Sequence, residues 1–209
     1  MSAGAHNDVS LAHRVILGLV TPGSTVLDLG CGDGELLEKL VSRRQCRVQG
    51  IEIDEEMIYR CVERGLSVFH SDIDSGLADY ADKSFDYVIL LNSLQELRNP
   101  DAALQDALRV GRRVIVGFPN FAFWRARFQL FFTGKTPVTP ALPFRWYETP
   151  NLHFLSILDF LEYCAMKRVR IERAVYLRNG RLVRFAPNLL AQHAIFMLRS
   201  TAPARCRSS

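Results

Sequence analysis

Three alternating glycines follow a short apolar run early in the chain. Residues 26–34 read Val-Leu-Asp-Leu-Gly-Cys-Gly-Asp-Gly. Glycine tolerates positive φ and has no side chain, so such a turn lets the backbone approach a ligand at the start of a helix. A dinucleotide-binding turn has the spacing G-x-G-x-x-G, whereas Gly30, Gly32 and Gly34 alternate strictly. The spacing therefore disfavours NAD.

An acidic residue stands two positions before the first glycine. Asp28 ends the predicted strand, where its carboxylate can accept hydrogen bonds from an ammonium group. S-adenosylmethionine carries an ammonium group and a pyrophosphate does not, so the acid favours an adenosyl cofactor. The alternative is a tight turn without a ligand, which is the common meaning of a lone glycine turn.

Acidic residues also end the next two predicted strands. The apolar pattern at 46–54 contains Glu52, eighteen positions after the last glycine, a distance that fits a strand-helix-strand unit. An acid at this point can accept hydrogen bonds from both ribose hydroxyls. Asp54 is a competing candidate, although its place before a helical pattern is typical of an N-cap. The third strand, 67–72, ends in Asp72, a candidate for the adenine amino group.

Strand and helix patterns alternate through residue 118, which predicts a parallel sheet covered on both faces. We expect seven strands in a mostly parallel sheet of an α/β, Rossmann-like fold. The later predicted elements are strands at 85–91, 113–118, 169–177 and 194–199, with a helix after Ser156. We predict one domain over 1–200, with an insertion or lid at 119–152, and a flexible tail at 201–209.

With these motifs the chain resembles the class I S-adenosylmethionine-dependent methyltransferases, whose first motif is similar to 28–34. The resemblance implies that this motif holds the methionine part, Glu52 the ribose, and Asp72 with Ile73 the adenine. Cys31 is interpreted as a small residue filling the turn rather than a nucleophile. The predicted cofactor-binding set is Asp28, Gly30, Cys31, Gly32, Gly34, Glu52, Ile53, Asp72, Ile73, Leu91 and Asn92.

The segment after the fourth predicted strand identifies no methyl acceptor. It reads Asn-Ser-Leu-Gln-Glu-Leu-Arg-Asn-Pro at 92–100, unlike the Asn/Asp-Pro-Pro-aromatic or Pro-Cys runs of methyltransferases that act on nucleic-acid bases. Many small-molecule members have a histidine near Glu96. Glu96 itself is either a general base or a solvated acid, so no catalytic residue is assigned.

A finer resemblance covers about residues 22–199. The run Gly-Phe-Pro-Asn-Phe-Ala-Phe-Trp at 117–124 and the stretch Thr-Pro-Val-Thr-Pro-Ala-Leu-Pro-Phe-Arg-Trp-Tyr-Glu-Thr-Pro-Asn-Leu-His-Phe at 136–154 are similar to the MetW family of methionine-biosynthesis proteins. The resemblance implies an accessory or activating partner of homoserine O-acyltransferase that binds S-adenosylmethionine. The alternative is an active methyltransferase with a small-molecule acceptor.

Charge divides the chain into two parts. Residues 1–118 contain 12 basic and 18 acidic side chains, a net of −6, whereas 119–209 contain 14 and 4, a net of +10. A basic part attracts an acidic protein, an acyl-CoA phosphate or RNA. Arg125 and Arg127 alternate with aromatic residues that could stack bases, cover a core or form a partner surface. We favour the interpretation of this aromatic and basic segment as a lid or docking element, and we expect no nucleic-acid function. These aromatic residues are Phe121, Phe123, Trp124, Phe128, Phe131 and Phe132.

Other features narrow the class of protein. The 209 residues contain neither a signal-peptide pattern nor an apolar stretch long enough for a bilayer, which predicts a cytoplasmic protein without membrane contact. Five cysteines without a C-x-x-C pair suggest reduced thiols rather than disulfides or a zinc site. His153 either faces the cofactor or holds its loop by a hydrogen bond, and no metal is expected.

Overall fold

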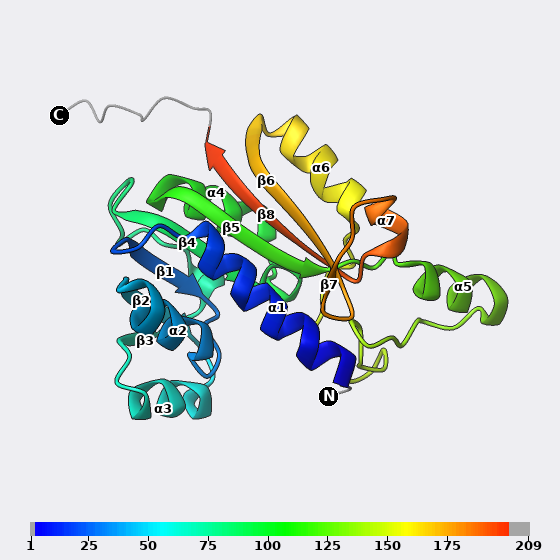
Figure 1. Ribbon diagram of the computed structural model, residues 1–209, viewed down its shortest axis with the longest axis horizontal. Coiled ribbons are helices and arrows are strands. Elements are labelled where there is room, and N and C mark those ends of the chain that lie inside the picture. Colours follow the sequence, from blue (N-terminus) through cyan, green and yellow to red (C-terminus); the bar gives the residue numbers. More distant parts are fainter. Residues whose placement is uncertain (1–2, 201–209) are drawn as a thin grey trace.

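One eight-stranded sheet organises the protein (Figure 1). The computed structural model describes residues 3–200, and the side chains of residues 8–200. The predicted α/β fold is confirmed, with the mostly parallel sheet that the strand patterns indicated. In sheet order the strands are β3 (Val68–His70), β2 (Arg47–Glu52), β1 (Thr25–Leu29), β4 (Phe85–Leu91), β5 (Gly111–Pro119), β8 (His193–Ser200), β6 (Val169–Arg178) and β7 (Arg181–Leu182).

The first five strands are parallel, with β1 paired to both β2 and β4. Strand β8 pairs antiparallel with β5 and with β6. The short β7 is the addition to the seven expected strands, and it pairs with β6 through a two-residue turn, Asn179-Gly180. Both turn residues have positive φ (48° and 72°), as the Asn-Gly hairpin signal requires.

Helices follow the predicted strands, and local caps explain where several of them begin. Asp54 accepts hydrogen bonds from the backbone N–H groups of Glu56 and Met57, which makes it the N-cap of α3. Ser156 and Asp159 form a capping box at α6. The helices are α1 (Ala3–Leu19), α2 (Glu35–Arg44), α3 (Glu55–Glu63), α4 (Pro100–Val110), α5 (Trp124–Thr133), α6 (Ile157–Met166) and α7 (Pro187–Leu190), with 3₁₀ turns η1 (Ile73–Ser75) and η2 (Leu94–Glu96).

Alternating side chains of the strands build a hydrophobic core on each face of the sheet. In β1, Leu27 and Leu29 join the core that contains residues of α4 and α6, whereas Val26 joins the core that contains residues of α1 and α2. By this alternation Asp28 points toward the same face as Val26. A charged residue therefore sits in an otherwise apolar row of the central strand.

Helix α1 lies outside the elements that the sequence patterns predicted. It runs across one face of the sheet (Figure 1) and contacts β6, β8 and α2. Among its described side chains, residues 8–19, those from Leu11 onward join the core on this face, and the buried Asp8 accepts a hydrogen bond from Gly180 N–H. Within residues 3–200 no helix is long and apolar enough to cross a membrane. The predicted tail at 201–209 lies outside the described residues.

Candidate functional site

The glycine turn joins β1 to α2 at the carboxyl ends of the parallel strands. Gly30, Gly32 and Gly34 have φ values of 78°, 55° and 78°, a region that side chains disfavour. The backbone N–H groups of Gly30 and Cys31 donate to the carbonyl oxygen of Ile51 at 2.8 and 3.2 Å. These bonds fix the turn against the end of β2.

The glycines of the turn differ in what surrounds them. A Cβ on Gly34 would lie 2.5 Å from Leu66 Cδ1 and 2.9 Å from Cys61 Sγ, whereas a Cβ on Gly32 would meet nothing within 4 Å. Gly34 therefore permits close packing of α2 against α3. Gly32 instead lines an open cavity.

Glu52 ends β2 beside the turn. Its Oε2 accepts a hydrogen bond from Gly32 N–H at 2.8 Å, and its Oε1 accepts from Ile53 and Asp54 N–H at 2.8 and 3.1 Å. Each carboxylate oxygen has two lone pairs, so Glu52 retains acceptor capacity on the cavity side. The same residue thus orders the turn and leaves one lone pair, on Oε2, for a ligand.

Asp28 lies beneath the turn with 2% of its surface exposed. Its Oδ1 has no hydrogen-bond partner among the described residues. Burial raises the pKa of Asp28 to about 7, and the charge of Glu52 contributes in the same direction. An unpaired buried carboxylate is costly. A cationic hydrogen-bond donor would remove this cost.

A cavity of about 590 Å³ lies between the turn and the ends of β2, β3 and β4. The structure brings most of the predicted cofactor residues into its wall: Gly30, Gly32, Glu52, Ile53, Asp72, Ile73, Leu91 and Asn92. Asp28, Cys31 and Gly34 do not line the wall. The wall also contains residues outside the predicted set, namely Ser71, Asp74, Ser93, Glu96, Leu97, Arg98, Pro150 and Leu152.

Cys31 packs on the inner side of the turn. It is buried, its Sγ lies 4.0 Å from Cys61 Sγ, and it would lie 2.6 Å from a Cβ on Gly50. Burial raises the pKa of the Cys31 thiol. This packing agrees with the interpretation of Cys31 as a small residue that fills the turn. Cys31 belongs to the predicted cofactor-binding set but is not among the residues that line the cavity of about 590 Å³.

Two aspartates shape the side of the cavity that follows β3. Asp72 Oδ1 accepts a hydrogen bond from Asp74 N–H at 2.9 Å. Asp74 in turn accepts from the backbone N–H groups of Arg98 and Asn99, and these bonds lower the pKa of Asp74. Asp74 thus connects the loop after β3 to the loop before α4. The sequence patterns could not reveal this role, because they do not show which loops are adjacent.

The opposite side of the cavity is built around η2. Asn92, with φ 60°, leaves β4 in the left-handed region. Ser93 Oγ donates to the carbonyl oxygen of Leu29 at 2.9 Å. The carbonyl oxygen of Gln95 accepts from the backbone N–H groups of Leu152 and His153 at 2.9 and 3.0 Å. A segment far along the chain therefore closes the wall, while α5 lies outside it.

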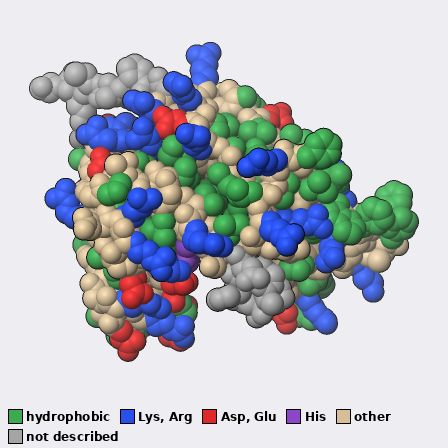
Figure 2. Space-filling view, in the orientation of Figure 1, with side chains coloured by type: hydrophobic (Ala, Val, Ile, Leu, Met, Phe, Trp, Pro, Cys, Tyr) green, Lys and Arg blue, Asp and Glu red, His purple; other side chains and the backbone are tan. Residues whose placement is uncertain are grey.

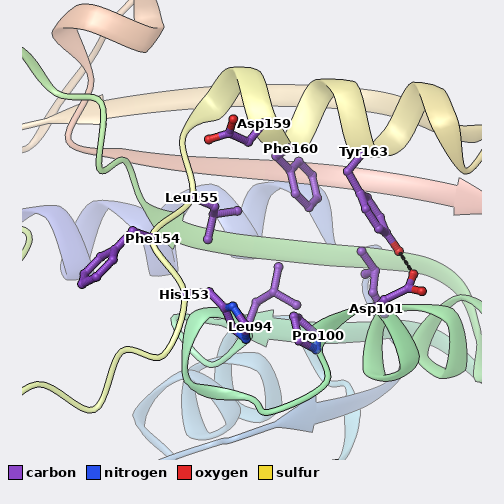
Figure 3. Close-up of a pocket in the computed structure, with 10 residues that line it drawn as sticks. Leu94, Pro100, Asp101, His153, Phe154, Leu155, Asp159, Phe160 and Tyr163 are labelled. Carbon is purple, nitrogen blue, oxygen red and sulfur yellow. Dashed lines mark hydrogen bonds between the residues drawn. The ribbon is translucent and has the colours of Figure 1, made fainter.

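A second cavity, of about 360 Å³, lies between η2, α4 and α6 (Figure 3). Leu94, Leu155 and Phe160 supply much of its apolar lining, and Tyr163 OH donates to Asp101 at 2.8 Å. His153 lies in this wall rather than in that of the first cavity. Within the described chain no cluster of three or more His, Cys, Asp or Glu residues is arranged to hold a metal ion.

Solved structures with the same fold cover almost the whole chain. A possible histamine N-methyltransferase of the S-adenosylmethionine-dependent class from Thermotoga maritima superposes with a TM-score of 0.65 at 16% identity, covering 93% of this chain and 90% of that one. Magnesium protoporphyrin IX methyltransferase from Synechocystis, solved with bound S-adenosylhomocysteine, gives 0.63 at 18% identity, covering 94% and 83%. The fold is therefore that of the class I methyltransferases.

Comparison of the sequence with known proteins identifies the family within this fold. A bifunctional methionine biosynthesis protein MetXA/MetW of Rhodopirellula baltica is 36% identical over 170 residues, which make up 77% of this chain and 27% of that protein. The chain thus spans about a quarter of this relative. The family model described as methionine biosynthesis protein MetW matches residues 11–198. The chain belongs to the MetW family.

Proposed function

We propose that the protein binds S-adenosylmethionine in the cavity of about 590 Å³ and acts as an accessory, activating partner of homoserine O-acyltransferase. The observation that carries the binding proposal is Asp28, a buried carboxylate whose Oδ1 has no hydrogen-bond partner in the described part of the chain. It lies directly behind a glycine turn and beside Glu52. The pair fits a ligand with an ammonium group and a ribose.

The residues of the cavity fit the parts of the cofactor. Asp28 and the glycine turn would hold the methionine part, because the ammonium group supplies the donor that Asp28 lacks. Glu52 would accept from a ribose hydroxyl with the remaining lone pair of Oε2. Asp72 and Ile73 would flank the adenine, with Ile53 and Leu91 as further apolar wall. When bound, S-adenosylmethionine supplies an electrophilic methyl group.

The partner is supported by the architecture of the bifunctional relative. That protein carries the names MetXA and MetW together, and this chain matches only 27% of it. We take its MetXA portion to be a homoserine O-acyltransferase, as the family resemblance implies. Fusion of two activities in one relative commonly reflects association of separate chains. We therefore expect the protein to bind the acyltransferase of its own genome.

A regulatory purpose follows from the chemistry of the ligand. S-adenosylmethionine is made from methionine, so its concentration reports the output of the pathway that homoserine acylation begins. Binding transmits a signal only when the ligand has different affinities for the free protein and the complex. The proposed function therefore includes a change of acyltransferase activation with S-adenosylmethionine.

The first test measures homoserine acyl transfer by the acyltransferase of the same genome, with and without an equimolar amount of this protein. The assay is repeated at saturating S-adenosylmethionine. A rate that rises only in the presence of the protein supports the accessory role. An unchanged rate in both arms contradicts it.

The second test addresses the cofactor cavity itself. Calorimetric titration with S-adenosylmethionine should show binding to the wild type and little binding to the Asp28→Ala, Glu52→Ala double variant. Tyr59→Ala, which alters an exposed side chain of α3, is the matched control. Retained affinity in the double variant would reject the site assignment.

A second candidate function is methyl transfer to a small molecule. The second cavity favours it, because it adjoins the cofactor cavity across η2 and has an apolar lining with His153 at its wall (Figure 3). Glu96 lies in the cofactor cavity with its pKa raised, first by burial and then by the charge of Glu52. A raised pKa suits a general base. Formation of S-adenosylhomocysteine with candidate acceptors would distinguish this function.

A further inference from the structure

Helix α5 carries aromatic side chains that no other part of the described chain covers. Phe128, Phe131 and Phe132 are 56%, 82% and 69% exposed, and Ala126 is the buried residue of the helix. Figure 1 shows α5 standing out from the sheet, and apolar side chains project at the same side in Figure 2. The alternative that these three residues cover a core is therefore excluded, and the favoured lid or docking element stays a prediction. Phe123, which precedes the helix, is buried as the core alternative expected.

The exposed rings form a continuous row along the helix. Ring centroids are separated by 5.9 Å between Trp124 and Phe128, 5.1 Å between Phe128 and Phe132, and 5.0 Å between Phe131 and Phe132. At these exposures the three phenylalanines present on the order of 400 Å² of apolar surface. Patches of this size on soluble proteins commonly mark interaction sites.

A groove adjoins the row where the chain folds back after α5. It has a volume of about 660 Å³, and its lining includes Lys135, Arg145, Trp146 and Tyr147. Trp146 and Tyr147 are 74% and 57% exposed. We call the exposed row of α5 together with this groove the docking face. It combines aromatic side chains and Arg145, which are of residue types enriched at protein interfaces, with the cation of Lys135.

The charge around the docking face selects between possible occupants. Residues 119–152 contain four cations, Arg125, Arg127, Lys135 and Arg145, and one acid, Glu148. A second copy of this protein would bring like charges together, which is unfavourable across an interface. A protein with an acidic rim around an apolar centre has the complementary pattern.

We propose that the docking face binds homoserine O-acyltransferase at a surface of that enzyme that is apolar in its centre and acidic at its edge. This inference rests on the proposed function and assigns its partner to one surface. Phe131 and Phe132 are the anchors, since buried aromatic rings supply most interface energy. Lys135 and Arg145 contribute orientation and association rate.

The test measures binding of the purified acyltransferase to the full chain by biolayer interferometry. Phe131→Asp places a charge at the centre of the docking face and should weaken binding at least about tenfold. Tyr59→Asp makes the same kind of change at a side chain of α3 that is 70% exposed and should leave binding within about twofold. Phe131 lies outside the cofactor cavity, so unchanged affinity for S-adenosylmethionine verifies that the variant is folded.

A charge variant tests the rim independently. Lys135→Glu should slow association, and the wild-type association rate should fall as salt is raised. Unchanged acyltransferase affinity in Phe131→Asp would overturn the docking face while the proposed function stands. Failure of the wild type to bind would overturn both. A dimer of this protein that Phe131→Asp dissociates, with acyltransferase binding unaffected, would assign the face to self-association and overturn the proposal.

Discussion

The backbone N–H of Leu152 donates to the carbonyl oxygen of Gln95 at 2.9 Å. This bond joins the segment that follows the docking face to the 3₁₀ turn at the edge of the cofactor cavity. Leu152 itself is one of the residues that line that cavity. A ligand bound in the cavity and a partner bound on the proposed docking face would therefore contact one continuous stretch of chain, and any coupling between them must be reciprocal.

Hydrogen exchange provides a direct measure of this connection. S-adenosylmethionine should slow exchange of the amide hydrogens of Leu152 and His153 several-fold, because a ligand against Leu152 stabilises their bonds to Gln95. The amide of Val183, bonded to Tyr176 in the β6–β7 hairpin, is a distant reference. Equal protection of the amides of residues 151–153 with and without ligand would show that the cavity and this segment are uncoupled.

The buried carboxylate of Asp28 predicts a specific pH dependence of stability. Its folded-state pKa of about 7 exceeds the unfolded value near 3.9, so the folded chain binds more protons between these values. Its unfolding free energy should then fall as pH rises from about 4 to 7 and level off above, by up to roughly 4 kcal/mol. Denaturant unfolding of wild type and Asp28→Asn across this range isolates the contribution.

Asp28 should also make the affinity for S-adenosylmethionine depend on pH, and this affinity should rise with pH where the unfolding free energy falls. An ammonium ligand favours ionised Asp28, so affinity for S-adenosylmethionine should increase with pH up to about 7. Binding at pH 6 should release protons, which calorimetry in buffers of different ionisation enthalpy detects. In Asp28→Asn this proton release should be absent. A wild-type affinity that is flat with pH would place the ammonium group elsewhere.

Two glycine substitutions should separate packing from ligand contact. Gly34→Ala forces a methyl group against Leu66 and Cys61 at positive φ and should destabilise the protein by about 2–4 kcal/mol. Gly32→Ala meets no neighbouring atom and should cost about 1 kcal/mol, yet it should weaken cofactor binding because Gly32 lines the cavity. Thermal unfolding and calorimetry measure both effects. Equal destabilisation of the two variants would contradict this division.

Carboxylates in the cavity wall should make the protein discriminate between S-adenosylmethionine and S-adenosylhomocysteine. Glu52, Asp72 and Glu96 share the wall with Arg98, and the sulfonium charge is lost in the homocysteine form. Glu96→Gln should reduce the preference for S-adenosylmethionine roughly fivefold, which corresponds to about 1 kcal/mol, the attraction between two unit charges about 4 Å apart when water screens them fully. Competitive titration with both ligands measures the ratio. Glu148→Gln, in the basic segment outside the cavity, is the control.

Much of the cavity wall could be predicted from the sequence, because the motifs that form it lie within short stretches of the chain. A glycine turn, an acid at a strand end and an Asp N-cap each depend on a few adjacent residues. Parallel strands bring their carboxyl ends to one edge of the sheet, so Gly30, Glu52 and Asp72 had to converge once the strands were recognised. The alternation of strands and helices from residue 25 to residue 118 was predictable for the same reason, whereas helix α1 was not predicted.

Other features of the site depend on contacts between residues far apart in the chain, and only the tertiary structure determines these contacts. Leu152 reaches the cavity through a bond to Gln95, and no local pattern encodes that contact. Only the packing around Asp28 shows that its Oδ1 is buried and that no described residue hydrogen-bonds to it. The aromatic spacing of α5 is the same for a core helix and a docking helix, because periodicity describes one face and not what covers it. The fold determined that Phe131 remains exposed.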